Sequence, residues 1–118
     1  YQVLDKGNEM KETDESIEWI FLPPWKAITD STIFQIELAK ELNPEHPLYE
    51  APAKAIALRT DCDDVLFQIG DTEHYAVVHL TWTGKQETSP KWPGTSYYIG
   101  WKEVFEKVIV QDNSDYEK

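Results

Sequence analysis

Three runs of strand-forming residues lie so close together in this chain that they leave room for only one kind of sheet. The runs cover residues 53–60, 65–69 and 74–83, and the segments between them read DCDD and GDTE. Aspartate, glycine and threonine in segments this short are typical of turns. Parallel neighbours need a crossover of a dozen or so residues, whereas antiparallel neighbours are joined by a short turn. The spacing therefore predicts an antiparallel meander.

A helix is predicted on each side of the meander. The segment TDSTIFQIELAKELNP has Asp30 or Ser31 as an N-cap, and Asn43 followed by Pro44 as a stop. Farther along, an apolar stripe recurs at helical spacing, formed by Trp101, Val104, Phe105, Val108 and Ile109. We therefore predict an α+β domain in the order α-β-β-β-α with three strands, or four if residues 17–22 add an edge strand.

Alternation along the three runs sorts their side chains onto two faces of the sheet. The first face is strongly apolar and holds Ile56, Leu58, Val65, Phe67, Ile69, Ala76, Val78, Leu80 and Trp82. The second face is half polar and holds Ala55, Ala57, Arg59, Asp64, Leu66, Gln68, Tyr75, Val77, His79 and Thr81. We expect both helices to pack on the apolar face, with Trp82 buried near Trp101 or Phe105. His79 should point to the other side, near Arg59 or the turn at residues 61–64.

The 118 residues suffice for one domain and one core. We predict an acidic, mobile lead-in at residues 1–16, a single α+β domain at residues 17–111 and a polar tail at residues 112–118. The longest apolar stretch is interrupted by Pro23 and Pro24, which predicts no membrane span. Cys62 is the only cysteine, which favours a reducing compartment and predicts a cytoplasmic protein.

A net charge of −11 argues against nucleic acid as a partner, because binding to a phosphate backbone needs clustered lysine and arginine. The same charge is typical of a soluble, self-repelling protein, or of one that meets a basic protein partner.

The chain contains no phosphate loop, no paired-cysteine zinc spacing and no nucleophile elbow. What remains is a set of polar and aromatic residues near the strand ends. As candidate ligand-binding residues we take Arg59, Asp63, Asp64, His79, Thr81, Lys85, Glu87 and Trp92. Arg59 can hold an anion or pin the acidic turn, and a mid-strand histidine can be a ligand or a structural hydrogen-bonding residue. No catalytic set and no cofactor follow from this pattern.

A metal site is a weaker alternative. His46, Asp63 and His79 would supply two imidazoles and a carboxylate if the fold brought them together. Aspartates in a turn this short serve more simply as hydrogen-bond acceptors for the backbone.

The segment ALRTDCDDVLFQIG, followed by AVVHLTWTGKQE and Trp92 with Pro93, resembles a group of small uncharacterised bacterial proteins to which no activity is assigned. Their pattern has DCDDVLF, a short turn, AVVHLTWSGK, an acidic residue and an aromatic residue before proline. The likeness covers about residues 33–109, with Thr83 standing where the pattern more often has serine. The resemblance implies a small cytosolic bacterial protein and supplies no reaction.

Three functions compete on this reading. A non-enzymatic binding or regulatory module ranks first, because no catalytic set assembles. An immunity-type protein that neutralises a basic toxin is the second hypothesis, based on the net charge. A small hydrolase or metal-dependent enzyme that uses His79 is the third.

Overall fold

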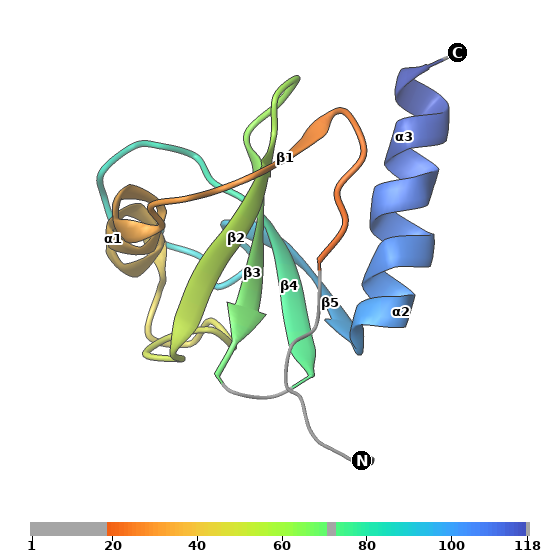
Figure 1. The fold of residues 1–118 in the computed structure, drawn as a ribbon. Coiled ribbons are helices and arrows are strands. Elements are labelled where there is room, and N and C mark those ends of the chain that lie inside the picture. The colour runs from red at the N-terminus through yellow and green to blue at the C-terminus, as the bar shows by residue number, and fades with distance from the viewer. Residues whose placement is uncertain (1–18, 71–72, 118) are drawn as a thin grey trace.

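A computed structural model of the chain describes residues 19–70 and 73–117. Within these residues, five strands form one antiparallel sheet, with a helix on each side of it (Figure 1). The strands are β1 (Trp25–Ala27), β2 (Ala53–Arg59), β3 (Asp64–Ile69), β4 (His74–His79) and β5 (Gly94–Ile99). Helix α1 (Thr32–Glu41) follows β1, and a longer C-terminal helix follows β5. The α+β class is confirmed.

The sheet is a meander in which each strand pairs with the next one along the chain, in the order β1-β2-β3-β4-β5. The three predicted strands lie at its centre as β2, β3 and β4. Both outer strands depart from the sequence prediction. Residues 19–22 are not a strand, because β1 begins after the proline pair, and β5 occupies residues 94–99, where the sequence analysis predicts no strand.

A β-bulge in β2 changes which side chains share a face. The register with β3 pairs Ala55 with Phe67 but Ala57 with Leu66, so one extra residue lies between the two pairs. An extra residue shifts the alternation of side chains by one position. For this reason Ala55 packs on the face predicted for Ile56, and Ile56 packs on the opposite face.

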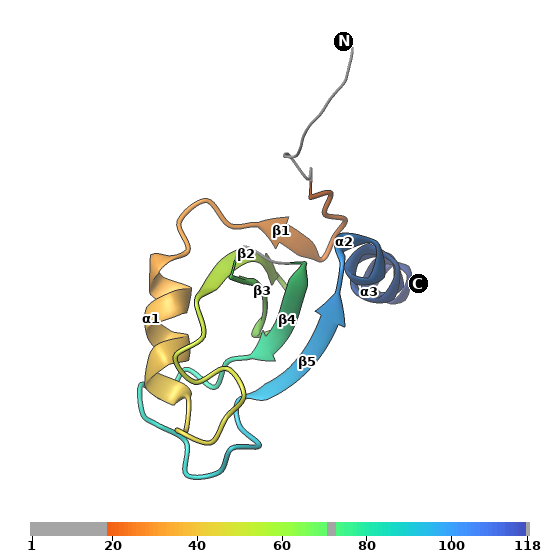
Figure 2. The same ribbon diagram turned by 90° about the horizontal axis from the view of Figure 1, so that it is seen from below.

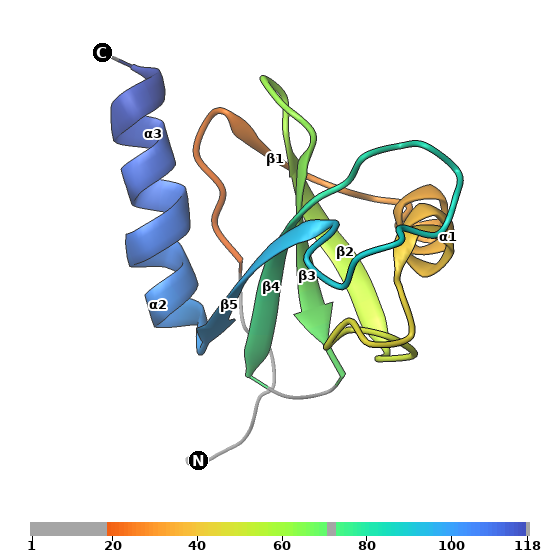
Figure 3. The same ribbon diagram turned by 180° about the vertical axis from the view of Figure 1, so that it is seen from behind.

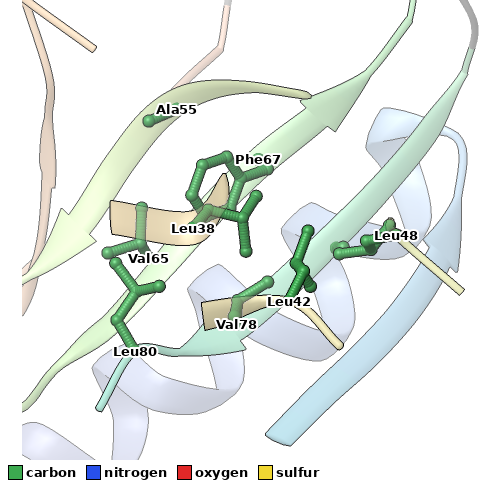
Figure 4. Packing of buried hydrophobic residues seen from close by; sticks show 9 residues of the cluster. Leu38, Leu42, Leu48, Ala55, Val65, Phe67, Val78 and Leu80 are labelled. Atoms are coloured by element: carbon green, nitrogen blue, oxygen red, sulfur yellow. The ribbon is translucent and has the colours of Figure 1, made fainter. Parts of the chain in front are cut away.

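The sheet separates two apolar cores. Helix α1 packs on one face, where the buried residues are Leu38, Leu42, Leu48, Ala55, Val65, Phe67, Ala76, Val78 and Leu80 (Figure 4). The C-terminal helix packs on the other face, where the buried residues are Trp25, Ile56, Ala57, Leu66, Tyr75, Val104, Val108 and Ile109. Figure 2 shows the two helices on opposite sides of the strands. Our expectation that both helices cover one face is therefore wrong.

The predicted amphipathic stripe forms the inner face of the C-terminal helix. The helix is continuous through α2 (Trp101–Val104), the π-helical turn η1 (Phe105–Val110) and α3 (Gln111–Tyr116). It therefore runs through most of the predicted polar tail. Asp112 accepts a hydrogen bond from the indole of Trp25 at 2.8 Å, and Asn113 donates one to the carbonyl of Pro23 at 2.7 Å. Figure 3 shows this helix beside β5 from behind.

Aromatic residues explain why residues 19–22 do not pair as a strand. Phe21 meets the ring of Trp101 edge to face at 5.7 Å, and the indole of Trp19 donates a hydrogen bond to the hydroxyl of Tyr75 at 3.2 Å. The segment thus covers the start of the C-terminal helix.

The predicted lead-in at residues 1–16 lies outside the described residues. Across residues 19–70 and 73–117 the structure contains no helix with the length and apolarity required to cross a membrane.

Candidate functional site

Arg59 lies at the end of β2 and is held by two carboxylates. Its guanidinium donates to both oxygens of Asp61, at 2.9 and 2.8 Å, and lies 3.5 Å from Asp112 of the C-terminal helix. The hydrogen bond from Arg59 lowers the pKa of the Asp61 carboxyl. A guanidinium held on two sides pins the turn between β2 and β3, as the structural alternative predicted.

His79 lies at the end of β4, directly opposite the first residue of β3. The register pairs it with Asp64, and its Nδ1 lies 2.8 Å from a carboxylate oxygen of that residue. The prediction that His79 reaches the turn at residues 61–64 is therefore confirmed. The histidine side chain is 55% exposed, so this pair lies at the surface and not in a core.

Beyond β4 the chain continues as a loop that contains Trp82. This residue has a φ of 56°, in the left-handed region that a bulky side chain rarely adopts. Its indole is 42% exposed and meets the ring of Phe34 on α1 edge to face at 5.9 Å. The prediction that Trp82 is buried near Trp101 or Phe105 is therefore wrong, because β4 ends at His79 and the strand alternation does not extend to Trp82.

Two glutamates of α1 hold this loop in place. Glu41 is fully buried, and its two carboxylate oxygens accept the backbone N–H groups of Thr81 at 2.9 Å and Trp82 at 2.8 Å. Glu37 is also buried and accepts the N–H of Gly84 at 3.0 Å. Sequence reasoning missed both residues. The available signal was a pair of acids four residues apart, each directly followed along the helix by an inward-facing leucine.

The two glutamates also interact with each other. Burial, together with the interaction with Glu37, raises the pKa of Glu41 to about 7. That interaction lowers the pKa of Glu37. Opposite shifts of this kind occur in catalytic acid and base pairs. Here both oxygens of Glu41 are occupied by backbone N–H groups, so the pair holds the loop and presents no free carboxyl to a substrate.

The rest of the loop is fastened to the end of α1. The hydroxyl of Thr81 donates to the carboxylate of Glu87 at 2.9 Å, and the N–H of Glu87 donates to the carbonyl of Glu41 at 2.9 Å. Asn43 donates to the carbonyl of Glu87 at 3.1 Å. The structure thus brings the predicted residues Thr81 and Glu87 together. The backbone N–H of Lys85 bonds to the hydroxyl of Thr83, and Lys85 is exposed.

Trp92 and His46 have other surroundings. Trp92 is 51% exposed and lies in the segment before β5, close to Gly94. His46 is buried, with one ring nitrogen accepting the N–H of Leu48 at 3.0 Å and the other 3.2 Å from the carbonyl of Pro93. These contacts give His46 a structural role. In the part of the chain that the structure describes, no group of three or more histidine, cysteine or acidic side chains could hold a metal ion, so the alternative site of His46, Asp63 and His79 does not assemble there.

A small cleft unites several of the predicted residues with Trp82. It has a volume of about 160 Å³ and is lined by Phe34, Leu58, Arg59, Cys62, Asp63, Asp64, Val65 and Trp82. We call this the Trp82 cleft. Desolvation is the largest of the effects that raise the pKa of the Cys62 thiol, so the cysteine presents a thiol and not a reactive thiolate.

The chain was compared with protein-family models, with curated proteins and with solved structures, and none of the three comparisons found a match. The resemblance to the bacterial group therefore stays a prediction.

Proposed function

We propose that this protein is a non-enzymatic binding module that receives a lysine or arginine side chain of a basic protein partner in the Trp82 cleft. The lining of the cleft includes two aromatic residues, Trp82 and Phe34, and two acidic residues, Asp63 and Asp64. Aromatic faces attract cations, and carboxylates pair with them.

The observation that carries the proposal is the conformation of Trp82. An exposed tryptophan at positive φ is costly on two counts, because its ring contacts water and its backbone is strained. The fold maintains this arrangement with the buried carboxylate of Glu41, which accepts the N–H of Trp82. Strain that the surrounding structure maintains is common at binding sites. A turn without a binding role would be better served by glycine at this position.

The charges around the cleft favour a cation. Arg59 is the positive group there, and Asp61 and Asp112 already hold it. The side chain of Asp63 is exposed, and Asp64 faces His79. The whole chain carries a net charge of −11, which also steers a basic partner toward it.

The size of the cleft supports a single side chain as the ligand. Its volume of about 160 Å³ is below the roughly 300 to 1,000 Å³ that is typical of sites for small molecules and cofactors. A small surface cleft with aromatic and acidic lining is suited to one anchoring residue of a protein interface, where arginine is often such an anchor.

Toxin neutralisation is one form that this function could take, because a basic toxin would supply the required cation. A hydrolase is less well supported. His79 is paired with Asp64, but the cleft offers it no activated nucleophile, because the pKa of Cys62 is raised.

A peptide titration tests the proposal. A hexa-arginine peptide is titrated into the protein, and the amide chemical shifts of residues around the cleft are followed by NMR. We expect saturable shifts near Trp82 and Asp63, and weakening by about tenfold in each of the variants Trp82→Ala and Asp63→Asn. A hexa-glutamate peptide should produce no shifts.

Two control variants separate the cleft from general charge attraction. Trp92→Ala removes another exposed tryptophan, and Glu45→Gln removes another exposed carboxylate. Both should bind the arginine peptide within about twofold of the wild type. Equal weakening in Glu45→Gln and Asp63→Asn would show that only net charge attracts the peptide, and the proposal would then fail.

A further inference from the structure

The loop that carries Trp82 depends on two carboxyl groups that lie one turn apart on α1. Glu41 holds the loop at Thr81 and Trp82, and Glu37 holds it at Gly84. Both carboxyl groups are buried, and the opposite shifts of their pKa values are those expected of two carboxyls that share one proton. The loop is therefore held by three backbone contacts and one proton.

We propose that the proton shared by Glu37 and Glu41 is a latch for this loop, and that its loss releases the Gly84 end and changes the setting of Trp82 in its cleft. The latch rests on the burial of the two glutamates and their three loop contacts, supported by the opposite shifts of their pKa values. Its effect on ligand binding rests on the proposed function.

The chemistry of the pair explains which end is released. With the proton present, neutral Glu41 donates to ionised Glu37, and all three N–H groups keep their acceptors. When the proton leaves to solvent, two like charges face each other in a largely buried space, which is strongly unfavourable. Glu41 is fully buried and binds two N–H groups, which stabilise its charged form. Glu37, with a single loop contact, is the group that moves toward water.

The groups around the pair favour this response. On α1, Lys40 attracts the charge of Glu37 toward the exposed side of the helix. From the loop, Glu87 shares the hydroxyl of Thr81, and Lys85 follows Gly84. The strands that pack against α1 contribute apolar side chains there, among them Val65, Val78 and Leu80. The positive groups that can offset a second negative charge on the pair are therefore Lys40, on the outer side of α1, and Lys85, at the exposed end of the loop.

The Gly84 end is free to move once its acceptor leaves. Gly84 has a φ of +70°, and a side chain built on it would find no atom within 4 Å. Trp82 is only two residues away, so a change at Gly84 is transmitted to its backbone. The raised pKa of Glu41, at about 7, places the loss of the proton near neutral pH.

NMR titration of the full chain between about pH 5 and pH 9 tests the latch. We expect the amide resonance of Gly84 to shift with a midpoint near neutral pH, and the indole resonance of Trp82 to follow it. The variant Glu41→Gln keeps an N–H donor toward Glu37 and one carbonyl acceptor for the loop. Its Gly84 resonance should stay at the low-pH position across the range.

A second variant keeps the test decisive if Glu41→Gln folds poorly. Glu37→Gln removes the opposing charge that drives the release, so the Gly84 resonance should lose its midpoint near neutral pH. Glu87→Gln is the matched control, because it removes a carboxylate of the same loop outside the pair, and its midpoint should match the wild type. A Gly84 resonance that does not titrate, or one that titrates equally in Glu41→Gln, would overturn the latch.

The binding readout is separate. The hexa-arginine titration is repeated at pH 6 and pH 8 with wild type and Glu41→Gln. If the affinity of the wild type for the peptide changes between pH 6 and pH 8 and that of Glu41→Gln does not, the link between latch and cleft is supported. The same change, or no change, in both proteins overturns the link. If the peptide binds nowhere near Trp82, the proposed function fails while the Gly84 titration still decides the latch.

Discussion

Leu66 offers the sharpest test of the two-sided core. It is fully buried at the centre of β3, paired with Ala57 and Val77, on the face that the C-terminal helix covers. The variant Leu66→Ala removes three carbon atoms from this core. At about 0.8 kcal/mol for each buried carbon, the transfer cost is about 2.4 kcal/mol. The unfilled cavity adds to this cost, because neighbouring strands limit collapse, so the total loss should be about 3 to 5 kcal/mol.

Urea titration followed by tryptophan fluorescence measures this loss as a change in midpoint with an unchanged slope. Ile33→Ala is the matched control, because Ile33 is 64% exposed on α1, and its change should stay within about 0.5 kcal/mol. A loss below about 1 kcal/mol in Leu66→Ala would refute the second core and restore the half-polar face that strand alternation predicted.

Two further outcomes follow from the polar contacts. The pKa of Glu41 is raised from 4.5 to about 7 in the folded protein. Between these two pH values the folded state keeps a proton that the unfolded chain loses. The contribution of Glu41 to stability therefore falls as the pH rises from about 4.5 to about 7. Urea titrations at pH 5 and pH 8 should show this loss in the wild type and not in Glu41→Gln, and equal losses in both would contradict it. His79→Ala should change the free energy of unfolding by less than about 1 kcal/mol, because the pair with Asp64 is exposed. A loss above about 2 kcal/mol in thermal or urea unfolding would make His79 structural.

The candidate site was only partly accessible to sequence reasoning. Arg59, Asp63 and Asp64 line one cleft, because they flank one turn and a turn keeps its residues together. The role of Trp82 was misjudged, because strand alternation was extended past the end of β4. Glu41 was missed altogether, since a glutamate on a helix is normally exposed and its acceptor role depends on a loop forty residues away.

The order of the elements could be read from the sequence for reasons that are local. Short acidic turns permit only antiparallel pairing of β2, β3 and β4, and a five-residue stripe at helical spacing requires a helix with one buried face. The start of α1 at Thr32 likewise has a local cause, since Ser31 occupies the N-cap position and the carboxylate of Asp30 accepts the N–H of Thr32 at 3.0 Å.

The placement of these elements in space was decided by tertiary structure. The bulge between Ala55 and Ala57 reversed the alternation within β2, and the second face became a core because the C-terminal helix crossed to it. The amphipathic stripe predicts that this helix buries one side, but both faces of the sheet offered apolar partners. Contacts between distant residues made the choice: Asp112 with Trp25 and Arg59, and Trp101 with Phe21. Such contacts exist only after the chain has folded, so no local pattern in the sequence encodes them.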